Sequence, residues 1–258
     1  MYAEPSLPAL SLDVLGAGPA FSDRPGATGA AYLVRAGATA ILLDLGQGSF
    51  PRLAGLMDPG ALDAVVVSHL HPDHFVDLVS LRHYLRWGPS HPRRSRVLGP
   101  SGLDDRLDAL NGEPGFSAAA LDIETLQPGL TAIGSLDLQS APVTHTEQSY
   151  GFRVATRDGP GLVYSGDCGR ADDLEALIQP GDDLLCEVSF GPGPVPPDAA
   201  HLDGPAVGEL AARTGVRRVL LTHLLMGFSP EETIASVLRS YHGPVALVQP
   251  GDRFIIAN

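Results

Sequence analysis

Three histidines and one aspartate lie within six consecutive positions, at His69, His71, Asp73 and His74. Imidazole nitrogens and carboxylate oxygens are the ligands with which proteins bind zinc and similar divalent metals. The run follows the apolar stretch 64–67, which would form a buried strand and deliver these side chains to the edge of a sheet. The pattern therefore predicts a metal site, and the alternative is a solvated, histidine-rich turn.

Three more residues of ligand type follow other apolar or extended runs, at His145, Asp167 and His223. Taken singly, they could be a loop histidine, a turn-forming aspartate beside Gly166 and the partner of a helix cap. Together with the run they supply seven nitrogen or oxygen ligands, enough for two metals that share a carboxylate and a bridging water. Two such metals lower the pKa of that water and stabilise charge on the group it attacks. The chemistry predicted is metal-dependent hydrolysis.

These ligands must be positioned by a sheet whose strands end close together. The apolar stretches 30–34 and 39–43 flank a turn that contains a glycine, and they predict a β-hairpin. Further buried strands are predicted at 64–67, 162–164, 183–186 and 219–221, and helices at 76–87, 103–110, 172–178, 205–213 and 230–240. We expect Asp203 and Ser229 to cap the last two helices. Strands that alternate with helices predict an α/β layer architecture.

Length and composition indicate one globular domain. The chain has 258 residues, of which 44% are hydrophobic and 18% charged, and it is long enough to bury a large core. The proline- and glycine-rich loop 191–197 is a candidate linker, but the segments on both sides of it supply parts of one predicted site. We therefore expect a single domain over residues 1–258.

Cysteine content and hydropathy predict a cytoplasmic protein. Cys168 and Cys186 do not make a disulfide framework, so free thiols in a reducing compartment are expected. Residues 1–6 lack the basic and apolar regions of a signal peptide, and no apolar run approaches the ~18 residues of a membrane-spanning helix. The sequence is compatible with a monomer and with a homodimer.

The charged residues argue against several partners and reactions. The 17 basic and 30 acidic residues give a formal charge of −13, which repels polyanions, so tight binding to long nucleic acid is not expected. The 17 basic residues are all arginine, so no lysine can form a Schiff base or bind phosphate in a Walker-type loop. One cluster would bind phosphate oxygens or form an ordinary solvated helix face and loop; its members are Arg82, Arg86, Arg93, Arg94 and Arg96.

The ordered ligand set resembles the metallo-β-lactamase superfamily over nearly the whole chain. The resemblance implies a four-layer αββα sandwich and two divalent ions, with zinc expected and manganese or iron as alternatives. Asp44, in the segment Leu-Leu-Asp-Leu-Gly, matches an aspartate that supports the metal ligands in this superfamily. Residue by residue, the resemblance implies that one metal is held by His69, His71 and His145, the other by Asp73, His74 and His223, and that Asp167 bridges them.

The C-terminal third resembles the phosphodiesterase branch that includes RNase Z, through the segment Cys-Glu-Val-Ser-Phe at 186–190, then His201, then Leu-Leu-Thr-His at 220–223. The resemblance implies that His201 donates a proton to the leaving oxygen and that Asp73 orients or deprotonates the attacking water. The alternative for His201 is an exposed histidine at the start of a helix. Position 167 carries Asp where class B β-lactamases carry Cys, which argues against antibiotic hydrolysis. We expect the neighbouring Cys168 to be a packed thiol.

The chain differs from RNase Z in the segment between His145 and Asp167, and this difference affects the expected substrate. Only 21 residues separate His145 from Asp167, with a hairpin-like segment 156–159 between them, and this leaves no room for the long arm that grips tRNA. We therefore expect a small phosphodiester, such as a cyclic nucleotide or a short nucleotide. The alternatives are a thioester or lactone hydrolase, a tRNA 3′-processing endonuclease, and a non-hydrolytic iron oxygenase or metal-binding regulatory protein. The segment Gly16-Ala-Gly18-Pro19 is expected to be a tight turn near the metal site.

Overall fold

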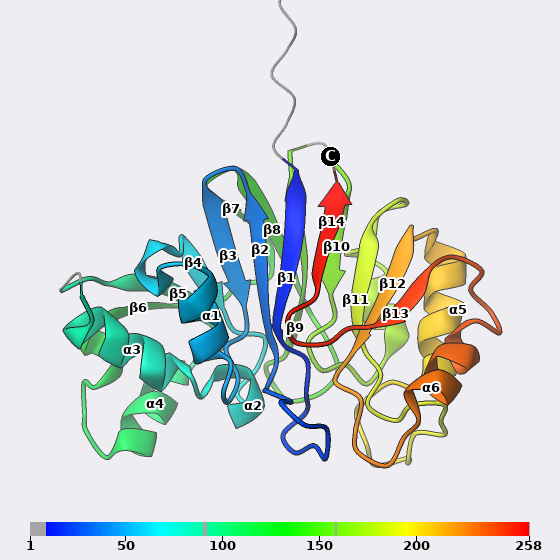
Figure 1. The fold of residues 1–258 in the computed structure, drawn as a ribbon, viewed down its shortest axis with the longest axis horizontal. Helices are drawn as coiled ribbons and strands as arrows, with labels where there is room; N and C mark the ends of the chain where they lie inside the picture. Colours follow the sequence, from blue (N-terminus) through cyan, green and yellow to red (C-terminus); the bar gives the residue numbers. More distant parts are fainter. Residues whose placement is uncertain (1–8, 90–91, 158, 258) are drawn as a thin grey trace, which may run out of the picture.

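The computed structural model describes residues 9–89, 92–157 and 159–257, and it consists of two β-sheets between two layers of helices (Figure 1). This arrangement confirms the predicted αββα sandwich. The prediction about a signal peptide rests on residues 1–6, which lie outside the described residues. Among the helices that the structure describes, none is long and apolar enough to cross a membrane.

The first sheet has the strand order β14-β1-β2-β3-β4-β5-β6. Its strands are β1 (Leu10–Gly16), β2 (Ala31–Ala36), β3 (Thr39–Leu43), β4 (Ala64–Val66), β5 (Ser95–Gly99), β6 (Leu121–Thr125) and β14 (Arg253–Ala257). Strands β14 to β3 pair antiparallel, and β3 to β6 pair parallel. The connections of this half contain α1 (Phe50–Leu56), α2 (Pro72–Phe75), α3 (Leu78–Trp87), α4 (Leu103–Asn111) and the short 3₁₀ helices η1 (Pro59–Ala61) and η2 (Ser117–Ala119).

The second sheet has the order β13-β12-β11-β10-β9-β8-β7. Its strands are β7 (Gly129–Ile133), β8 (Leu136–Pro142), β9 (Tyr150–Thr156), β10 (Gly161–Tyr164), β11 (Asp183–Glu187), β12 (Arg218–Thr222) and β13 (Val245–Leu247). Strands β7 to β10 pair antiparallel, whereas β10 to β13 pair parallel, so the last four strands end at the same edge. Helices α5 (Gly204–Thr214) and α6 (Pro230–Val237) cover this half, which also contains the 3₁₀ helix η3 (Ala171–Leu174).

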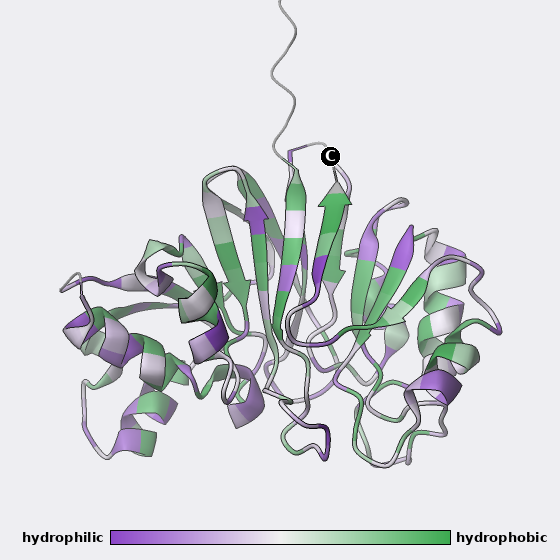
Figure 2. Cartoon of the chain, viewed as in Figure 1, coloured by the Kyte–Doolittle hydropathy of each residue, from purple (hydrophilic) through white to green (hydrophobic). Residues whose placement is uncertain are grey.

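Three apolar clusters hold the layers together. One lies between the sheets and includes Leu12, Tyr32 and Phe152; the other two lie between each sheet and its helices. Figure 2 shows hydrophobic residues concentrated along the central strands. Because both faces of the sheets are covered, strands such as β4 and β11 are buried along their whole length, which explains their continuous apolar runs. The assignment of residues 1–258 to one domain stays a prediction.

Most of the predicted elements are present. The hairpin is formed by β2 and β3, with Ala36 paired to Thr39. The predicted caps are also present, since the side chains of Asp203 and Ser229 accept hydrogen bonds from the first turns of α5 and α6. The hairpin-like segment 156–159 joins the antiparallel strands β9 and β10, although residue 158 lies outside the described residues.

The helix predicted at 172–178 is wrong. The chain there forms only η3 and a following turn, with hydrogen bonds from the Leu177 amide to the Leu174 carbonyl and from the Glu175 amide to the Asp172 carbonyl. These bonds span three residues, as in a 3₁₀ helix. The carboxylate of Asp173 also accepts a hydrogen bond from the Thr144 amide, which ties the segment to the end of β8. The spacing of the two buried leucines suits a 3₁₀ turn as well as an α-helix, so the apolar pattern was ambiguous.

Candidate metal centre

The predicted ligands leave the ends of strands from both sheets and come together at one edge. His69, His71 and the helix α2 follow β4, whereas Asp167 and His223 follow the parallel strands β10 and β12. One potential ligand atom from each residue of the set His69, His71, His145 and Asp167 lies within 4.8 Å of the others, and the same holds for the set Asp73, His74 and His223. We call His69, His71 and His145 the outer group, and Asp73, His74 and His223 the inner group.

Asp167 lies between the two groups. Its Oδ2 atom is 3.7 Å from Nε2 of His69 and 3.6 Å from Nε2 of His145, both in the outer group. Its Oδ1 atom is 3.3 Å from Nε2 of His74 and 3.4 Å from Nε2 of His223, both in the inner group. Each carboxylate oxygen thus faces a different group, which is the arrangement that a bridging ligand requires.

Buried atoms without partners show that the site fits metal ions. Among the described residues, Nε2 of His69, Nε2 of His74 and Oδ1 of Asp167 are buried and have no hydrogen-bond partner. Buried polar atoms are rarely left unpaired, because losing contact with water without replacing it costs about 1–3 kcal/mol. All three atoms point into the same cluster of nitrogen and oxygen ligands, so two divalent ions would satisfy them.

Most of the candidate imidazoles are oriented by a hydrogen bond on their outward side. Nδ1 of His74 donates to Asp44 Oδ2 at 2.7 Å, and Nδ1 of His145 donates to the Ala200 carbonyl at 2.8 Å. Such contacts select the tautomer whose Nε2 lone pair faces the metal. His71 differs, since its Nδ1 faces Nε2 of His145 at 3.1 Å. These two nitrogens therefore face the same point in the outer group.

Asp44 is the main support of the inner group. Its carboxylate is fully buried and accepts hydrogen bonds from the Ser68 amide and hydroxyl, from the Tyr164 hydroxyl and from His74. The Ser68 hydroxyl, in turn, lies 3.1 Å from Nδ1 of His69. The supporting role implied by the resemblance thus corresponds to a direct contact, and Ser68 and Tyr164 join it although no sequence pattern singled them out.

A second carboxylate, Glu187, supports His223 and His201. The Ser189 hydroxyl donates to Glu187 Oε2 and accepts from Nδ1 of His223 at 3.0 Å. Nδ1 of His201 donates to Glu187 Oε1 at 2.8 Å. The ring of His201 lies 4.7 Å from that of His145, and a potential ligand atom of His201 lies within 4.8 Å of Asp167 and His223. His201 therefore lies beside the candidate metal ligands rather than on an exposed helix start.

Burial and neighbouring charges shift the protonation of these groups. Burial raises the pKa of Asp167, but the imidazoles of His223 and His74 outweigh it and hold that pKa well below its usual value. Burial lowers the pKa of His69 well below the usual value of an imidazole. For His201, burial lowers the pKa, yet the hydrogen bond to Glu187 raises it above its usual value. An ionised carboxylate and a neutral imidazole are the forms that bind metal.

The backbone at two ligands of the inner group is tightly constrained. His223 has φ 59°, a conformation that is strained for a residue with a side chain, and its amide donates to the Ala17 carbonyl. This contact places residues 16–19 beside the candidate metal centre, as expected. The predicted tight turn is wrong, however, because Gly16 ends β1 and Gly18 forms an isolated bridge with Gly29, so the chain there continues extended. Gly46 packs against Asp73 so closely that an added Cβ would lie 1.8 Å from the Asp73 carbonyl oxygen. Only glycine fits there.

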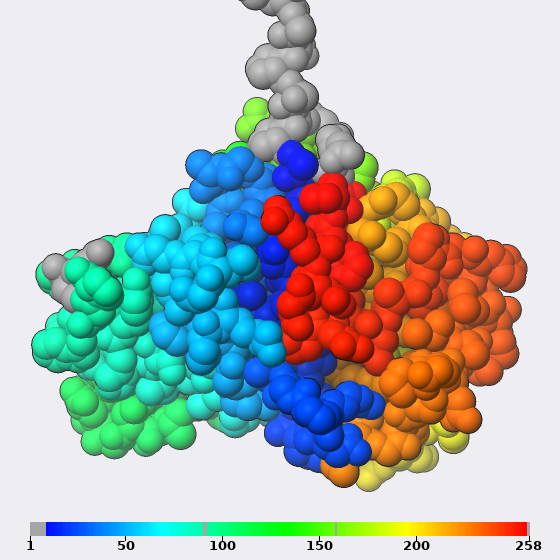
Figure 3. Space-filling view, in the orientation of Figure 1, coloured from blue at the N-terminus to red at the C-terminus, as the bar shows by residue number. Residues whose placement is uncertain are grey.

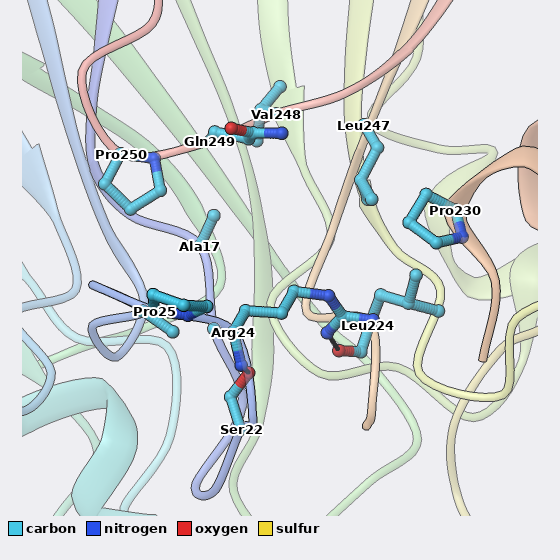
Figure 4. A pocket seen from close by; sticks show the side chains of 12 residues that line it. Ala17, Ser22, Arg24, Pro25, Leu224, Pro230, Leu247, Val248, Gln249 and Pro250 are labelled. Atoms are coloured by element: carbon cyan, nitrogen blue, oxygen red, sulfur yellow. Dashed lines mark hydrogen bonds between the residues drawn. The ribbon is translucent and has the colours of Figure 1, made fainter. Parts of the chain in front are cut away.

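A cavity of about 310 Å³ is lined in part by Leu224, the residue that directly follows His223. Arg24 crosses it and donates to the carbonyl oxygens of Leu224, Leu225 and Phe228 at 2.6, 3.3 and 3.3 Å (Figure 4). The loop that carries Arg24 therefore packs against the segment that follows His223 (Figure 3, blue against orange). The guanidinium holds the two segments together.

The predicted arginine cluster does not face the metal centre. Arg82 is buried and donates to the Phe116 carbonyl, whereas Arg93, Arg94 and Arg96 form ion pairs with Asp58, Asp122 and Glu124. Arg86 lies over the ring of Trp87. These contacts favour the structural alternative for the cluster. A different arginine, Arg106, lines a cavity together with His71, and no sequence pattern had indicated it.

The two cysteines are free and buried. Burial raises the pKa of the Cys168 thiol to about 12, and its Sγ donates to the Arg170 carbonyl. Cys168 is therefore a packed thiol, as expected.

Comparisons with known proteins agree with this geometry. Residues 39–224 match the family model described as "Beta-lactamase superfamily domain". An uncharacterised protein of Mycobacterium leprae is 35% identical over 239 residues, which cover 90% of this chain and 84% of that protein. A ribonuclease Z of Mycobacterium bovis is 31% identical over 195 residues, which cover 68% of this chain and 69% of that protein.

A solved structure shows the same fold. The metallo-beta-lactamase fold protein YhfI from Bacillus subtilis superimposes with a TM-score of 0.84 at 21% identity, covering 95% of this chain and 99% of that one. The family match, the identities and the clustered ligands agree. The chain therefore belongs to the beta-lactamase superfamily and is one of its metal-dependent hydrolases.

Proposed function

We propose that this hydrolase cleaves a small phosphodiester, such as a cyclic nucleotide or a short nucleotide. The observation that carries the proposal is the position of His201, which Glu187 holds beside the candidate metal ligands. Because Nδ1 of His201 is bound to Glu187, its Nε2 is the nitrogen left to reach a substrate. A phosphodiester needs such a group, since its leaving alkoxide must be protonated.

The residues of the outer and inner groups, with Asp167, would hold two divalent ions. We propose zinc on the basis of the nitrogen-rich donor set, with manganese or iron as alternatives. When bound, a pair of ions supplies an activated water and neutralises charge on the phosphoryl oxygens. The protein's own contribution is to orient that water, or to accept its proton, through the carboxylate of Asp73, and to donate a proton from His201 to the leaving oxygen.

Two features support a small substrate. The described residues between His145 and Asp167 form the strands β9 and β10 and their short connections, and they include no protruding arm. The formal charge of −13 repels long polyanions. A tRNA endonuclease, which the ribonuclease Z relative suggests, is the second candidate. A thioester hydrolase would have little use for His201, because its thiolate leaving group needs less protonation than an alkoxide. A lactone hydrolase would also release an alkoxide, so it stays an alternative that a lactone substrate tests.

The test is to replace His201 with alanine and measure metal content and turnover. We expect both ions and the fold to be retained, while turnover falls by ~10²–10⁴-fold, the usual effect of losing a general acid. The defect should shrink for a nitrophenyl diester, whose leaving anion is stable without protonation. His242→Ala, at an exposed position outside the site, is the matched control.

Two outcomes would contradict this role. Loss of one ion from His201→Ala would make His201 a metal ligand. An equal defect for good and poor leaving groups would remove the proton-donor role, and with it the main reason to prefer phosphodiesters over thioesters. Cleavage of tRNA at the 3′ end with tight binding at physiological salt would favour the second candidate.

A further inference from the structure

A cavity of about 320 Å³ adjoins the outer group of ligands. It is lined by His71 together with Leu70, Ser101, Arg106, Thr146, Glu147 and Gln148. Because His71 is exposed and belongs to both the wall of this cavity and the outer group, a substrate bound at the metal centre can extend into the cavity. Its volume is at the lower end of the range for small-molecule sites, so it suits one substituent rather than a whole nucleotide chain.

Arg106 is the cation of this cavity. It projects from α4, and its NH1 atom donates to the Leu70 carbonyl at 3.2 Å, which ties it to the segment that carries His71. Among the described residues no carboxylate forms an ion pair with Arg106, in contrast to Arg93, Arg94 and Arg96. A guanidinium has five N–H donors, and most of those of Arg106 remain available to a ligand.

Two further polar side chains in the lining, Gln148 and Glu147, have opposite effects on a bound anion. Gln148 accepts a hydrogen bond from the Ser101 amide through Oε1, so its NH₂ group is oriented as a further donor. Glu147 adds one negative charge to the wall. The cavity therefore has donors for an anion, and Glu147 weakens the attraction for it.

We infer that this cavity binds a second anionic group of the substrate, most simply an additional phosphate, through Arg106. The inference rests on the proposed function, because it places that phosphate next to a diester bound at the metals. A guanidinium binds two phosphate oxygens at once, which a single ammonium cannot do. The preferred substrate would then be a phosphodiester that carries a further phosphate, rather than a diester with a single charge.

The kinetic test uses two chromogenic diesters that share the 4-nitrophenyl ester of thymidine 5′-phosphate and differ only in a phosphate on the 3′ oxygen. We expect the wild-type chain to show the lower KM for the 3′-phosphorylated compound. Arg106→Ala should raise that KM about tenfold, as expected for one partly exposed charge-assisted contact, and leave kcat and the other substrate unchanged. Arg106→Lys should recover only part of the loss, and Glu147→Gln should lower the same KM.

A binding experiment separates this inference from the proposed function. Calorimetry of thymidine 3′,5′-bisphosphate and thymidine 5′-phosphate needs no turnover, so it tests Arg106 even if neither diester is cleaved. The bisphosphate should bind more tightly, and Arg106→Ala should remove that difference. Arg239→Ala removes an equal charge from an exposed position after α6 and is the matched control. Equal affinities in the wild-type chain, or an equal loss in both arginine variants, would overturn the inference.

Discussion

The inner and outer groups of the metal centre differ in burial and in support. In the inner group Asp73, His74 and His223 are all buried, and the two imidazoles are held by the buried carboxylates of Asp44 and, through Ser189, Glu187. In the outer group His71 is exposed, whereas His69 is fully buried and the imidazole of His145 is 6% exposed. The outward partner of His145 is a backbone carbonyl rather than a carboxylate. The inner group thus has the stronger support from carboxylates, and His71 is the ligand most open to solvent.

Two arginines, Arg24 and Arg106, show the same division. Arg24 uses its guanidinium on three carbonyl oxygens of the segment that follows His223, and it joins two segments of the chain. Arg106, beside the outer group, makes one contact to a carbonyl and leaves donors free in a cavity. The guanidinium of Arg24 therefore stabilises the structure, whereas that of Arg106 is available to bind a ligand. The following changes test this division, beginning with the residue that the two groups share.

Asp167→Ala should have the largest effect, because its two oxygens face different groups. We expect metal content to fall from about two ions per chain to well below one, and turnover to fall to background. Elemental analysis of carefully loaded protein measures the first, and a diester assay the second. Circular dichroism checks that the fold is retained. Selective loss of a single ion would show that Asp167 is not shared.

Asp44→Asn should affect the inner group far more than the outer group. The amide keeps the shape of the carboxylate but lacks its charge. Removing a residue that orients a metal ligand through a hydrogen bond typically lowers the metal affinity by about 10–100-fold. A chelator titration should therefore show one of the two ions released at much lower chelator concentration. Asp63→Asn, which alters a carboxylate that accepts a hydrogen bond from the Ala40 amide of β3, is the control. Equal weakening of both ions would contradict the difference between the groups.

Arg24→Ala and Arg106→Ala should separate stability from binding, with the smallest effects of the series. Loss of the Arg24 contacts should lower the free energy of unfolding by about 1–3 kcal/mol, or roughly 2–4 °C in Tm for each kcal/mol. Arg106→Ala should change stability by less than about 0.5 kcal/mol, the usual range for a surface residue. Thermal unfolding measures both. A larger loss for Arg106 would show that it, too, is structural.

The ligand run could be recognised because its determinants are local. An apolar strand at 64–67 ends two positions before His69, and apolar strands also precede Asp167 and His223, so residue type and strand position coincide in the sequence. The αββα architecture followed from the same pattern, since buried strands covered on both faces have continuous apolar runs. The helix at 172–178 was wrong for the same reason, because Leu174 and Leu177 fit two kinds of turn.

The arginines mark the limit of local patterns. The cluster at 82–96 was grouped by nearness in the sequence, yet Arg93 and Arg94 bind carboxylates 35 and 28 positions away. Arg106 lies on a predicted helix and had no distinguishing neighbour. Its importance depends on its contact with Leu70, 36 positions earlier, and on the cavity that the two segments share.

Residue types, strand ends and the superfamily resemblance could thus be derived from the sequence, because each depends on short runs of neighbouring residues. The packing of the two sheets was needed to learn which oxygen of Asp167 faces which group, and to bring Glu187 against His201. It was also needed to join Arg24 to Leu224 across 200 positions. Such contacts arise when distant strand ends meet at one edge, and their distances depend on the whole core rather than on any local pattern.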